Sequence, residues 1–121
     1  MRTTRQRGNH WEQVAEGFLN KRGLKTLERN FEVRFGEIDL VMLDQDTLVF
    51  AEVRYRENDR HGSGADSVTR TKQQRITRAA HHYLQRNPGS HLRPCRFDVI
   101  SIGTVEGRTV LNWIRDAFEA A

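Results

Sequence analysis

The first clear pattern in the chain is a stripe of apolar residues at helical spacing. From Trp11 to Leu19 these residues recur three and four positions apart, as on one face of an amphipathic helix. Asn9 is a suitable N-cap before the stripe, and Gly23 is a suitable stop after it. Residues 1–8 are basic and carry almost no apolar side chain. The sequence therefore predicts a flexible basic arm followed by a helix from Asn9.

The next three apolar segments have the alternation of β-strands. In residues 24–35 the apolar side chains from Phe31 to Phe35 alternate with charged ones and form a predicted inner face. Two further strand-like runs follow at 37–43 and 47–55, joined by a polar turn. The second run is almost continuously apolar, which indicates a central strand that is covered on both faces.

The second half of the chain predicts another helix and another strand. Residues 56–66 have no periodicity and predict a flexible loop, whereas 67–85 have an apolar helical face. A strand is expected over 96–102, and 113–118 predict a terminal helix or strand extension. The order helix, strand, hairpin, helix, strand predicts one α/β domain over residues 9–121, with a mixed β-sheet flanked by α-helices.

Composition adds a partner class to this picture. The chain has 20 Lys and Arg against 16 acidic residues, a net charge of +4, and this surplus favours polyanions such as nucleic acid. No segment has the roughly 20 apolar residues of a bilayer span, and no apolar signal follows the basic N-terminus. A single cysteine, Cys95, excludes an internal disulfide and a cysteine-based zinc cluster. We expect a cytoplasmic protein without a membrane partner.

The residues with the most chemical potential are acids inside two predicted strands. Residues two positions apart on a strand project from the same face. The first strand therefore offers the pair Glu37 and Asp39, and the second offers the pair Glu52 and Arg54. A two-residue turn sets Asp39 opposite Glu52. The same register sets Glu37 opposite Arg54. Opposed carboxylates repel unless a cation or a proton lies between them. A divalent metal is the simplest remedy, and oxygen ligands favour Mg²⁺ or Mn²⁺.

The same residues also fit plainer roles. Asp39 and Glu52 could be exposed strand residues, and Arg54 could simply pair with Glu37 across the sheet. Glu12 lies at the margin of the helical stripe. It could be a third acid that reaches over the sheet edge, or it could be the glutamate of a capping box.

Basic residues form a second candidate group. Lys72, Arg75 and Arg78 recur every three positions on the second predicted helix. They could follow a phosphate backbone if this helix face borders the acids, or they could form an ordinary solvated face. Together with Arg54 and Arg56 on the preceding strand, they are the residues we expect to contact nucleic acid.

Five motifs in this order resemble the YraN family of bacterial proteins, and the similarity spans nearly the whole chain. The motifs are Gly8-x-x-x-Glu12, Gly36-Glu37-Ile38-Asp39-Leu40-Val41, Val49-Phe50-Ala51-Glu52-Val53-Arg54-Tyr55-Arg56, Lys72-Gln73 and Arg96-Phe97-Asp98-Val99-Ile100. That family is similar to archaeal Holliday-junction resolvases and to the PD-(D/E)xK restriction-endonuclease-like superfamily. The core of that superfamily has an aspartate and an E-x-K motif on adjacent strands.

The resemblance implies a restriction-endonuclease-like fold and assigns roles to the acids. By this likeness Asp39 and Glu52 are the metal ligands, and Glu12 is the helix acid of the resolvase-like branch. The superfamily lysine position holds Arg54, which stays charged at any accessible pH and cannot act as a base. Lys72 could substitute from the neighbouring helix, or the protein could bind branched DNA without cutting it.

Three classes of function follow. The first is a Mg²⁺-dependent or Mn²⁺-dependent phosphodiester hydrolase acting on structured, branched DNA, with Glu12, Asp39, Glu52 and Arg54 as its catalytic residues. The second is a nucleic-acid-binding protein that keeps the nuclease fold without turnover. The third is a protein-interaction domain with an incidental basic surface. Since resolvase-like relatives pair on two-fold junctions, a homodimer is also expected.

Overall fold

The protein is described by a computed structural model that covers residues 4–56 and 68–121. Its elements, in chain order, are α1 (Thr4–Asn20), β1 (Lys25–Val33), β2 (Gly36–Asp44), β3 (Thr47–Arg56), α2 (Arg70–Arg86), the 3-10 helix η2 (Ser90–Leu92), β4 (Cys95–Val105) and β5 (Arg108–Phe118). The predicted α/β domain with a helix-flanked mixed sheet is confirmed. From residue 57 on, the predicted loop lies outside the described residues. Within the described ranges, neither α1 nor α2 is long and apolar enough to cross a membrane.

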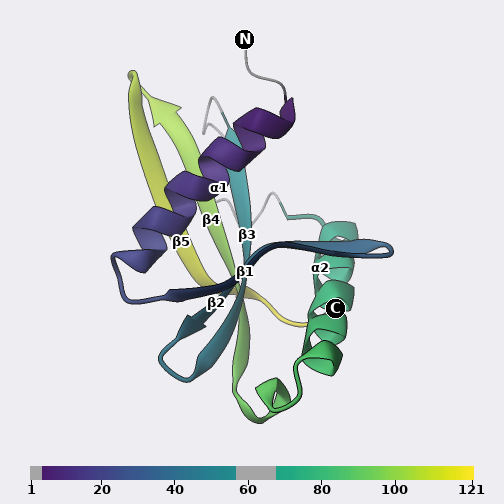
Figure 1. Cartoon of the computed structure of the whole chain (residues 1–121). Coiled ribbons are helices and arrows are strands. Elements are labelled where there is room, and N and C mark those ends of the chain that lie inside the picture. Colours follow the sequence, from purple (N-terminus) through teal and green to yellow (C-terminus); the bar gives the residue numbers. More distant parts are fainter. Residues whose placement is uncertain (1–3, 57–67) are drawn as a thin grey trace.

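The strands form one sheet in the order β1-β2-β3-β4-β5. Only β3 and β4 are parallel, and the other neighbours are antiparallel. A parallel pair needs a long crossover connection, which α2 provides on its way from β3 to β4 (Figure 1). The segment 113–118, predicted as helix or strand, is the last part of β5.

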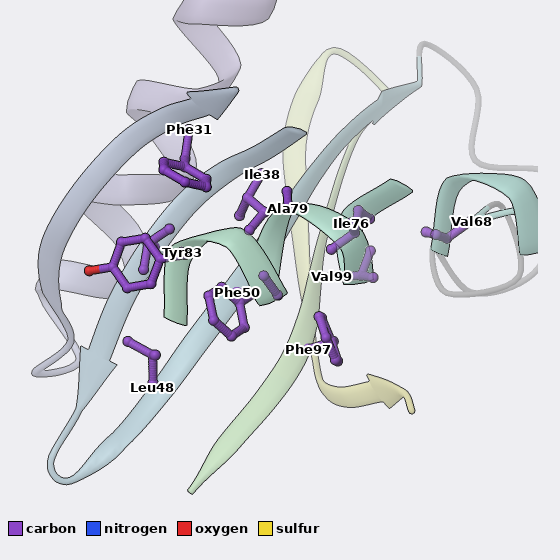
Figure 2. Close-up of a cluster of buried hydrophobic side chains, with 12 residues drawn as sticks. Phe31, Ile38, Leu48, Phe50, Val68, Ile76, Ala79, Tyr83, Phe97 and Val99 are labelled. Carbon is purple, nitrogen blue, oxygen red and sulfur yellow. The ribbon is translucent and has the colours of Figure 1, made fainter. Parts of the chain in front are cut away.

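Each face of the sheet packs against one helix. On the α2 side, aromatic and aliphatic residues of the first four strands meet Ile76, Ala79 and Tyr83 (Figure 2). On the α1 side, Ala15 and Leu19 pack on a second buried cluster. The central strand β3 serves both clusters because its side chains alternate between the faces. Its residues Leu48, Val49, Phe50 and Ala51 are at most 1% exposed, as predicted.

Both helices begin at positions that differ from the sequence prediction. Helix α1 begins at Thr4, so residues 4–8 belong to the helix and not to a separate basic arm. Polar residues such as Arg and Gln are good helix formers and allow this extension. Asn9 therefore lies inside α1 and cannot be its N-cap, which also removes the capping-box role for Glu12. Helix α2 begins later than predicted, where Thr69 Oγ1 accepts a hydrogen bond from Lys72 N at 3.2 Å.

The tip of the β1–β2 hairpin separates from β3 and lies across α2 (Figure 1). Pairing of β2 with β3 runs from Asp44↔Thr47 to Leu40↔Ala51, in the register that the two-residue turn predicted. Pairing of β1 with β2 continues to Val33↔Gly36. The tip packs tightly on the helix, because a Cβ atom at Gly36 would lie 2.5 Å from the Arg75 backbone oxygen.

The alternation of β2 reverses at the point where the two hairpin arms leave β3. Ile38 belongs to the α2-side cluster and Leu40 to the α1-side cluster, although they are two residues apart. On β1, Asn30 has a left-handed backbone with φ 52°, which breaks the regular pleat there. The prediction that Glu37 and Asp39 share a face with Glu52 and Arg54 is therefore wrong for Glu37, which pairs with Glu32 of β1.

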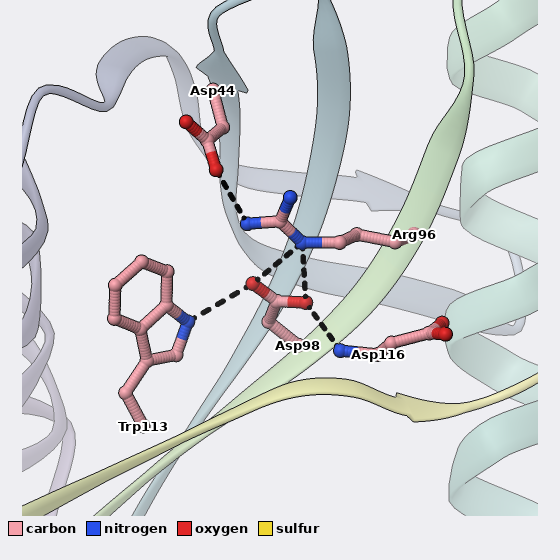
Figure 3. A network of polar contacts seen from close by, with 5 residues as sticks. All are labelled: Asp44, Arg96, Asp98, Trp113 and Asp116. Atoms are coloured by element: carbon pink, nitrogen blue, oxygen red, sulfur yellow. Dashed lines mark hydrogen bonds and ion pairs between the residues drawn. The ribbon is translucent and has the colours of Figure 1, made fainter.

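Asp98 anchors the sheet edge formed by β4 and β5 (Figure 3). Its carboxylate is 1% exposed and accepts hydrogen bonds from Arg96 Nε at 3.0 Å, Trp113 Nε1 at 3.0 Å and the Asp116 backbone N–H at 2.9 Å. Arg96 in turn bonds Asp44 at 2.8 Å. These partners satisfy a buried charge, so the Phe-Asp-Val-Ile motif serves the fold.

Candidate functional site

Three acids from three elements meet where the hairpin leaves β3. Asp39 of β2 lies at the centre, close enough to Glu12 of α1 and Glu52 of β3 for its charge to raise the pKa of both. Asp39 Oδ2 also accepts the Val53 backbone N–H at 2.8 Å. Thus a side chain of β2 takes over the contact with β3 beyond the last paired residues.

Glu52 is the most deeply placed of the three acids. The residue is 6% exposed. Burial and the neighbouring Asp39 carboxylate raise the pKa of Glu52 to about 8, although Lys72 acts in the opposite direction. Two carboxyl groups this close cannot both ionise readily in a buried setting. At neutral pH and without a further cation, Glu52 therefore keeps its proton.

The pKa of Asp39 is subject to opposing influences. Burial raises its pKa and Glu37 adds to this rise, but the hydrogen bonds from the Val53 N–H and from Glu52 lower it. A carboxylate that accepts several hydrogen bonds is stabilised in its charged form. The net result is a raised pKa for Asp39 as well, so Asp39 and Glu52 titrate as a coupled pair whose carboxyl groups do not both ionise readily at neutral pH.

Lys72 supplies the positive charge at this site. Its Nζ atom lies 3.3 Å from Glu52 Oε1, and the Lys72 side chain is partly exposed. Lys72 lies in the first turn of α2, which brings the amine over the sheet from the helix side. Among the described residues, Lys72 is thus the cation that forms an ion pair with Glu52.

Glu12 completes the acid group from the opposite helix. Burial and the Asp39 charge raise the pKa of Glu12 to about 7, while a hydrogen bond with Asn30 lowers it. A cavity of about 210 Å³ opens beside Glu12, and Asn9, Asn30 and Leu40 contribute to its walls. Glu12 therefore has direct access to open space.

The predicted basic residues divide into two sets. Arg54 and Arg56 are half-buried and follow Glu52 at steps of two residues on β3, so they project from the same side of that strand. Arg75 and Arg78 lie further along α2, where they border a cavity of about 360 Å³ with Phe35 of the hairpin tip. Lys72 thus contacts the acid group, whereas Arg75 and Arg78 lie further along α2, away from the acids.

The chemistry of the donors decides which ions the acids could hold. Among residues 4–56 and 68–121, no group of three His, Cys, Asp or Glu side chains is arranged to hold a metal ion. Asp39 and Glu52 do form a pair of hard oxygen donors with too little positive charge around it. Mg²⁺ is usually bound by one or two carboxylates and keeps several waters, so this donor pair fits such an ion.

Two features of the site were not predicted from the sequence. One is the left-handed Asn30, whose side chain holds Glu12. Asparagine is enriched at positive φ among non-glycine residues, and this was the available signal. The other is the bond from the Val53 N–H to Asp39, for which the sequence has no local signal because it depends on the hairpin leaving β3.

Comparison with known proteins places the chain in a family. A model of "Uncharacterised protein family UPF0102" matches residues 11–102. A UPF0102 protein of Nitrosococcus oceani is 49% identical over 96% of this chain and 94% of its own length. A UPF0102 protein of Alcanivorax borkumensis is 45% identical over 98% of this chain and 95% of its own length. The chain therefore belongs to the UPF0102 family, which is the YraN family that its motifs indicated.

Proposed function

We propose that this protein is a metal-dependent phosphodiester hydrolase that acts on structured DNA, with a restriction-endonuclease-like fold. The observation that carries the proposal is the buried contact of Asp39 with Glu52, one from each of two adjacent strands, with Lys72 Nζ 3.3 Å from Glu52. The mixed sheet with a helix on each face supports the fold assignment.

In this proposal Asp39 and Glu52 hold Mg²⁺ or Mn²⁺. Such an ion neutralises phosphate charge and lowers the pKa of water bound to it. The acids themselves favour this arrangement, because burial and the neighbouring Asp39 disfavour the ionised form of Glu52, and a bound cation stabilises that form. A divalent cation relieves the repulsion that a proton relieves in the free protein.

Lys72 takes the part that the superfamily assigns to the lysine two residues after the glutamate. That position holds Arg54, which can bind and stabilise a phosphate but cannot exchange a proton. An amine can do both, and Lys72 reaches the same carboxylate from α2. Glu12, whose pKa is raised to about 7 by burial and Asp39, is suited to accept or donate a proton near neutral pH.

The basic residues beyond the acids are placed to position the proposed DNA substrate through its phosphates. Arg54, Arg56, Arg75 and Arg78 lie on β3 and α2, the two elements that hold Glu52 and Lys72. Phosphate contacts of this kind position a nucleic acid without reading its sequence. This favours recognition of DNA shape, as expected for a protein that acts on branched DNA.

A nuclease assay tests the proposal. Branched, flapped and linear DNA are incubated with wild-type protein and Mg²⁺ or Mn²⁺, alongside Asp39→Ala and Glu52→Gln. We expect cleavage by the wild type and a loss of at least about a hundredfold in both variants. Glu16→Gln is the matched control, since Glu16 lies on α1 in an ion pair with Arg29. Equal activity in all four proteins would assign the cleavage to a contaminant or another site.

A second candidate is a nucleic-acid-binding protein of the same fold without turnover. Two observations favour it: Arg54 occupies the lysine position, and within the described residues no three-donor metal group is assembled. Under this alternative, DNA affinity falls steeply with salt but does not change on chelation or in Glu52→Gln. Fluorescence anisotropy with and without EDTA separates the two candidates.

A further inference from the structure

Phe35 is an exposed aromatic residue at the tip of the β1–β2 hairpin. The sequence predicted it on the inner face with Phe31, but its side chain is 62% exposed and its backbone is left-handed with φ 64°. A bulky residue at positive φ is a genuine outlier, and such outliers persist only where the surroundings hold them. The structure holds this one through Gly36, which packs against the α2 backbone.

Four polar or guanidinium-bearing residues of α2 line the space beside this ring. Arg78 lies over the Phe35 ring at 6.0 Å from its centroid, and Arg34 of the hairpin lies at 5.0 Å. A cavity of about 360 Å³ lies between the ring and α2, with Thr71, Gln74, Arg75 and Arg78 as its other walls. The ring thus forms one wall of an open, positively charged recess.

The recess is close to the acid site along α2. Lys72 contacts Glu52, and Arg75 and Arg78 follow at steps of three residues. Because a helix rises ~1.5 Å per residue, Arg78 lies only ~9 Å beyond Lys72 along the axis. Thr71, which precedes Lys72 in the chain, is itself a wall of the recess, so a nucleotide chain with one phosphate at Lys72 has a neighbouring base within reach of it.

We propose that Phe35 stacks on an unpaired nucleobase next to the phosphate that contacts Lys72, beside Asp39 and Glu52. This rests on the proposed function and deepens it, since it names the substrate as DNA with an unpaired nucleotide beside the cleavage site. Aromatic rings flanked by arginine are the usual stacking platforms for unpaired bases. Inside a continuous duplex both faces of each base are covered by neighbouring bases, so a duplex without a bulge offers Phe35 no internal base, and its two ends are shared with the bulged DNA.

Binding in EDTA tests this without any need for cleavage. Fluorescence anisotropy compares wild type with Phe35→Leu on a bulged DNA and on a matched blunt duplex. Loss of one base–aromatic stack should weaken binding of the bulged DNA about tenfold and leave the duplex unchanged. Phe35→Tyr should restore the wild-type affinity. Leu92→Ala, at an exposed apolar residue of η2, is the control and should bind like wild type.

Each other result has a defined meaning. Equal affinity of Phe35→Leu for the bulged DNA overturns the inference. An equal loss on both DNAs also overturns it, because Phe35 then only positions the hairpin. If wild type cleaves no DNA but Phe35→Leu still loses bulge affinity, the hydrolase proposal fails and the stacking site stands. If cleavage depends on Asp39 and Phe35→Leu binds normally, only the stacking site fails.

Discussion

Glu12 and Glu16 lie one turn apart on α1 and have opposite electrostatic environments. Burial and Asp39 raise the pKa of Glu12 to about 7. Burial acts to raise the pKa of Glu16 too, but hydrogen bonds from Arg29 and Thr26 outweigh it and lower that pKa. The charge of Glu16 is thus stabilised by its hydrogen-bond partners, whereas Glu12 faces the negative charge of Asp39.

The contrast predicts opposite effects of the same substitution. Glu12 stays protonated to a higher pH in the folded state than in the unfolded state. The wild type therefore loses stability as pH rises from about 4.5 to about 7. Glu12→Gln removes this loss and should raise the free energy of unfolding at pH 8 by about 1 kcal/mol, a value reduced for solvent screening of this half-buried group. Urea unfolding at pH 5 and pH 8 measures it.

Glu16→Gln should instead destabilise the protein at neutral pH. The lowered pKa of Glu16 means that its charged form stabilises the fold above the ordinary pKa of 4.5, and that this stabilisation is lost as pH falls through the folded-state value. The difference between wild type and Glu16→Gln should therefore shrink in acid, as followed by urea unfolding from pH 3 to pH 8. A pH-independent difference would mean that Glu16 acts through packing and not through its charge.

Glu52→Gln gives the clearest test of the coupled pair. The amide resembles protonated Glu52 and can still donate to Asp39. Because the folded-state pKa of Glu52 is raised from 4.5 to about 8, the wild type loses stability as pH rises through this interval, and the variant does not. We expect the variant to be more stable by about 1–3 kcal/mol above pH 8 and equal to wild type near pH 5. Thermal unfolding of both proteins in EDTA, from pH 5 to above pH 8, measures this difference. If the stabilities of wild type and variant changed in parallel with pH, Glu52 would be ionised throughout and the prediction would be wrong.

At the residue scale, the sequence predicted the meeting of Asp39 and Glu52 through the two-residue turn that sets the register. It did not predict that Glu37 leaves their face, because this depends on the broken pleat at Asn30 and Asp39. The sequence left open whether Lys72 reaches the acids from the neighbouring helix. The answer depends on how α2 packs on β3, which no local pattern of the sequence encodes.

At the element scale, the β1–β2 hairpin is the part whose position the site depends on. Its arms carry Asn30 and Asp39, and its tip carries Phe35 and Gly36. The close contact of Gly36 with α2 fixes the tip, since only a residue without a Cβ atom fits there. Docking of the tip on α2 therefore determines where β2 leaves β3.

Gly36→Ala should move the hairpin and weaken the fold together. The added Cβ would lie 2.5 Å from the Arg75 backbone oxygen and 3.2 Å from the Ala79 backbone nitrogen, neither of which can rotate away. We expect a loss of about 1–3 kcal/mol in the free energy of unfolding, measured by chemical denaturation. Gly17→Ala is the matched control, because nothing lies within 4 Å of a Cβ atom there, and it should not destabilise α1.

Element boundaries were predictable where turns have strong residue preferences. The Gln45–Asp46 turn was predicted, whereas the β4–β5 hairpin was missed, although Glu106 and Gly107 both have positive φ. Paired positive φ values with glycine second are typical of a tight hairpin turn, and Gly107 was the available signal. Phe35 was misplaced because a period-two pattern does not show where a strand ends and its turn begins.

At the scale of the whole molecule, the site collects negative charge within a basic protein. The chain has a net charge of +4, yet Glu12, Asp39 and Glu52 meet in one place with Lys72 as the adjacent cation. The acids come from α1, β2 and β3, and the amine comes from α2. Only the folded chain brings them together, so anything that binds this group should also stabilise the fold.

Mg²⁺ should therefore raise the melting temperature in a way that depends on pH. The ion competes with the proton that Glu52 holds, because the pKa of Glu52 is raised to about 8 by burial and Asp39, and binding must release that proton. The stabilisation should be large near pH 8. It should be small near pH 5.5, where protons outcompete Mg²⁺ for the Glu52 carboxylate. Glu52→Gln should lose the effect and Glu16→Gln should keep it. A Mg²⁺ response that is the same at both pH values, or that survives Glu52→Gln, would place the ion elsewhere on the protein and remove the main physical support for hydrolysis at Asp39 and Glu52.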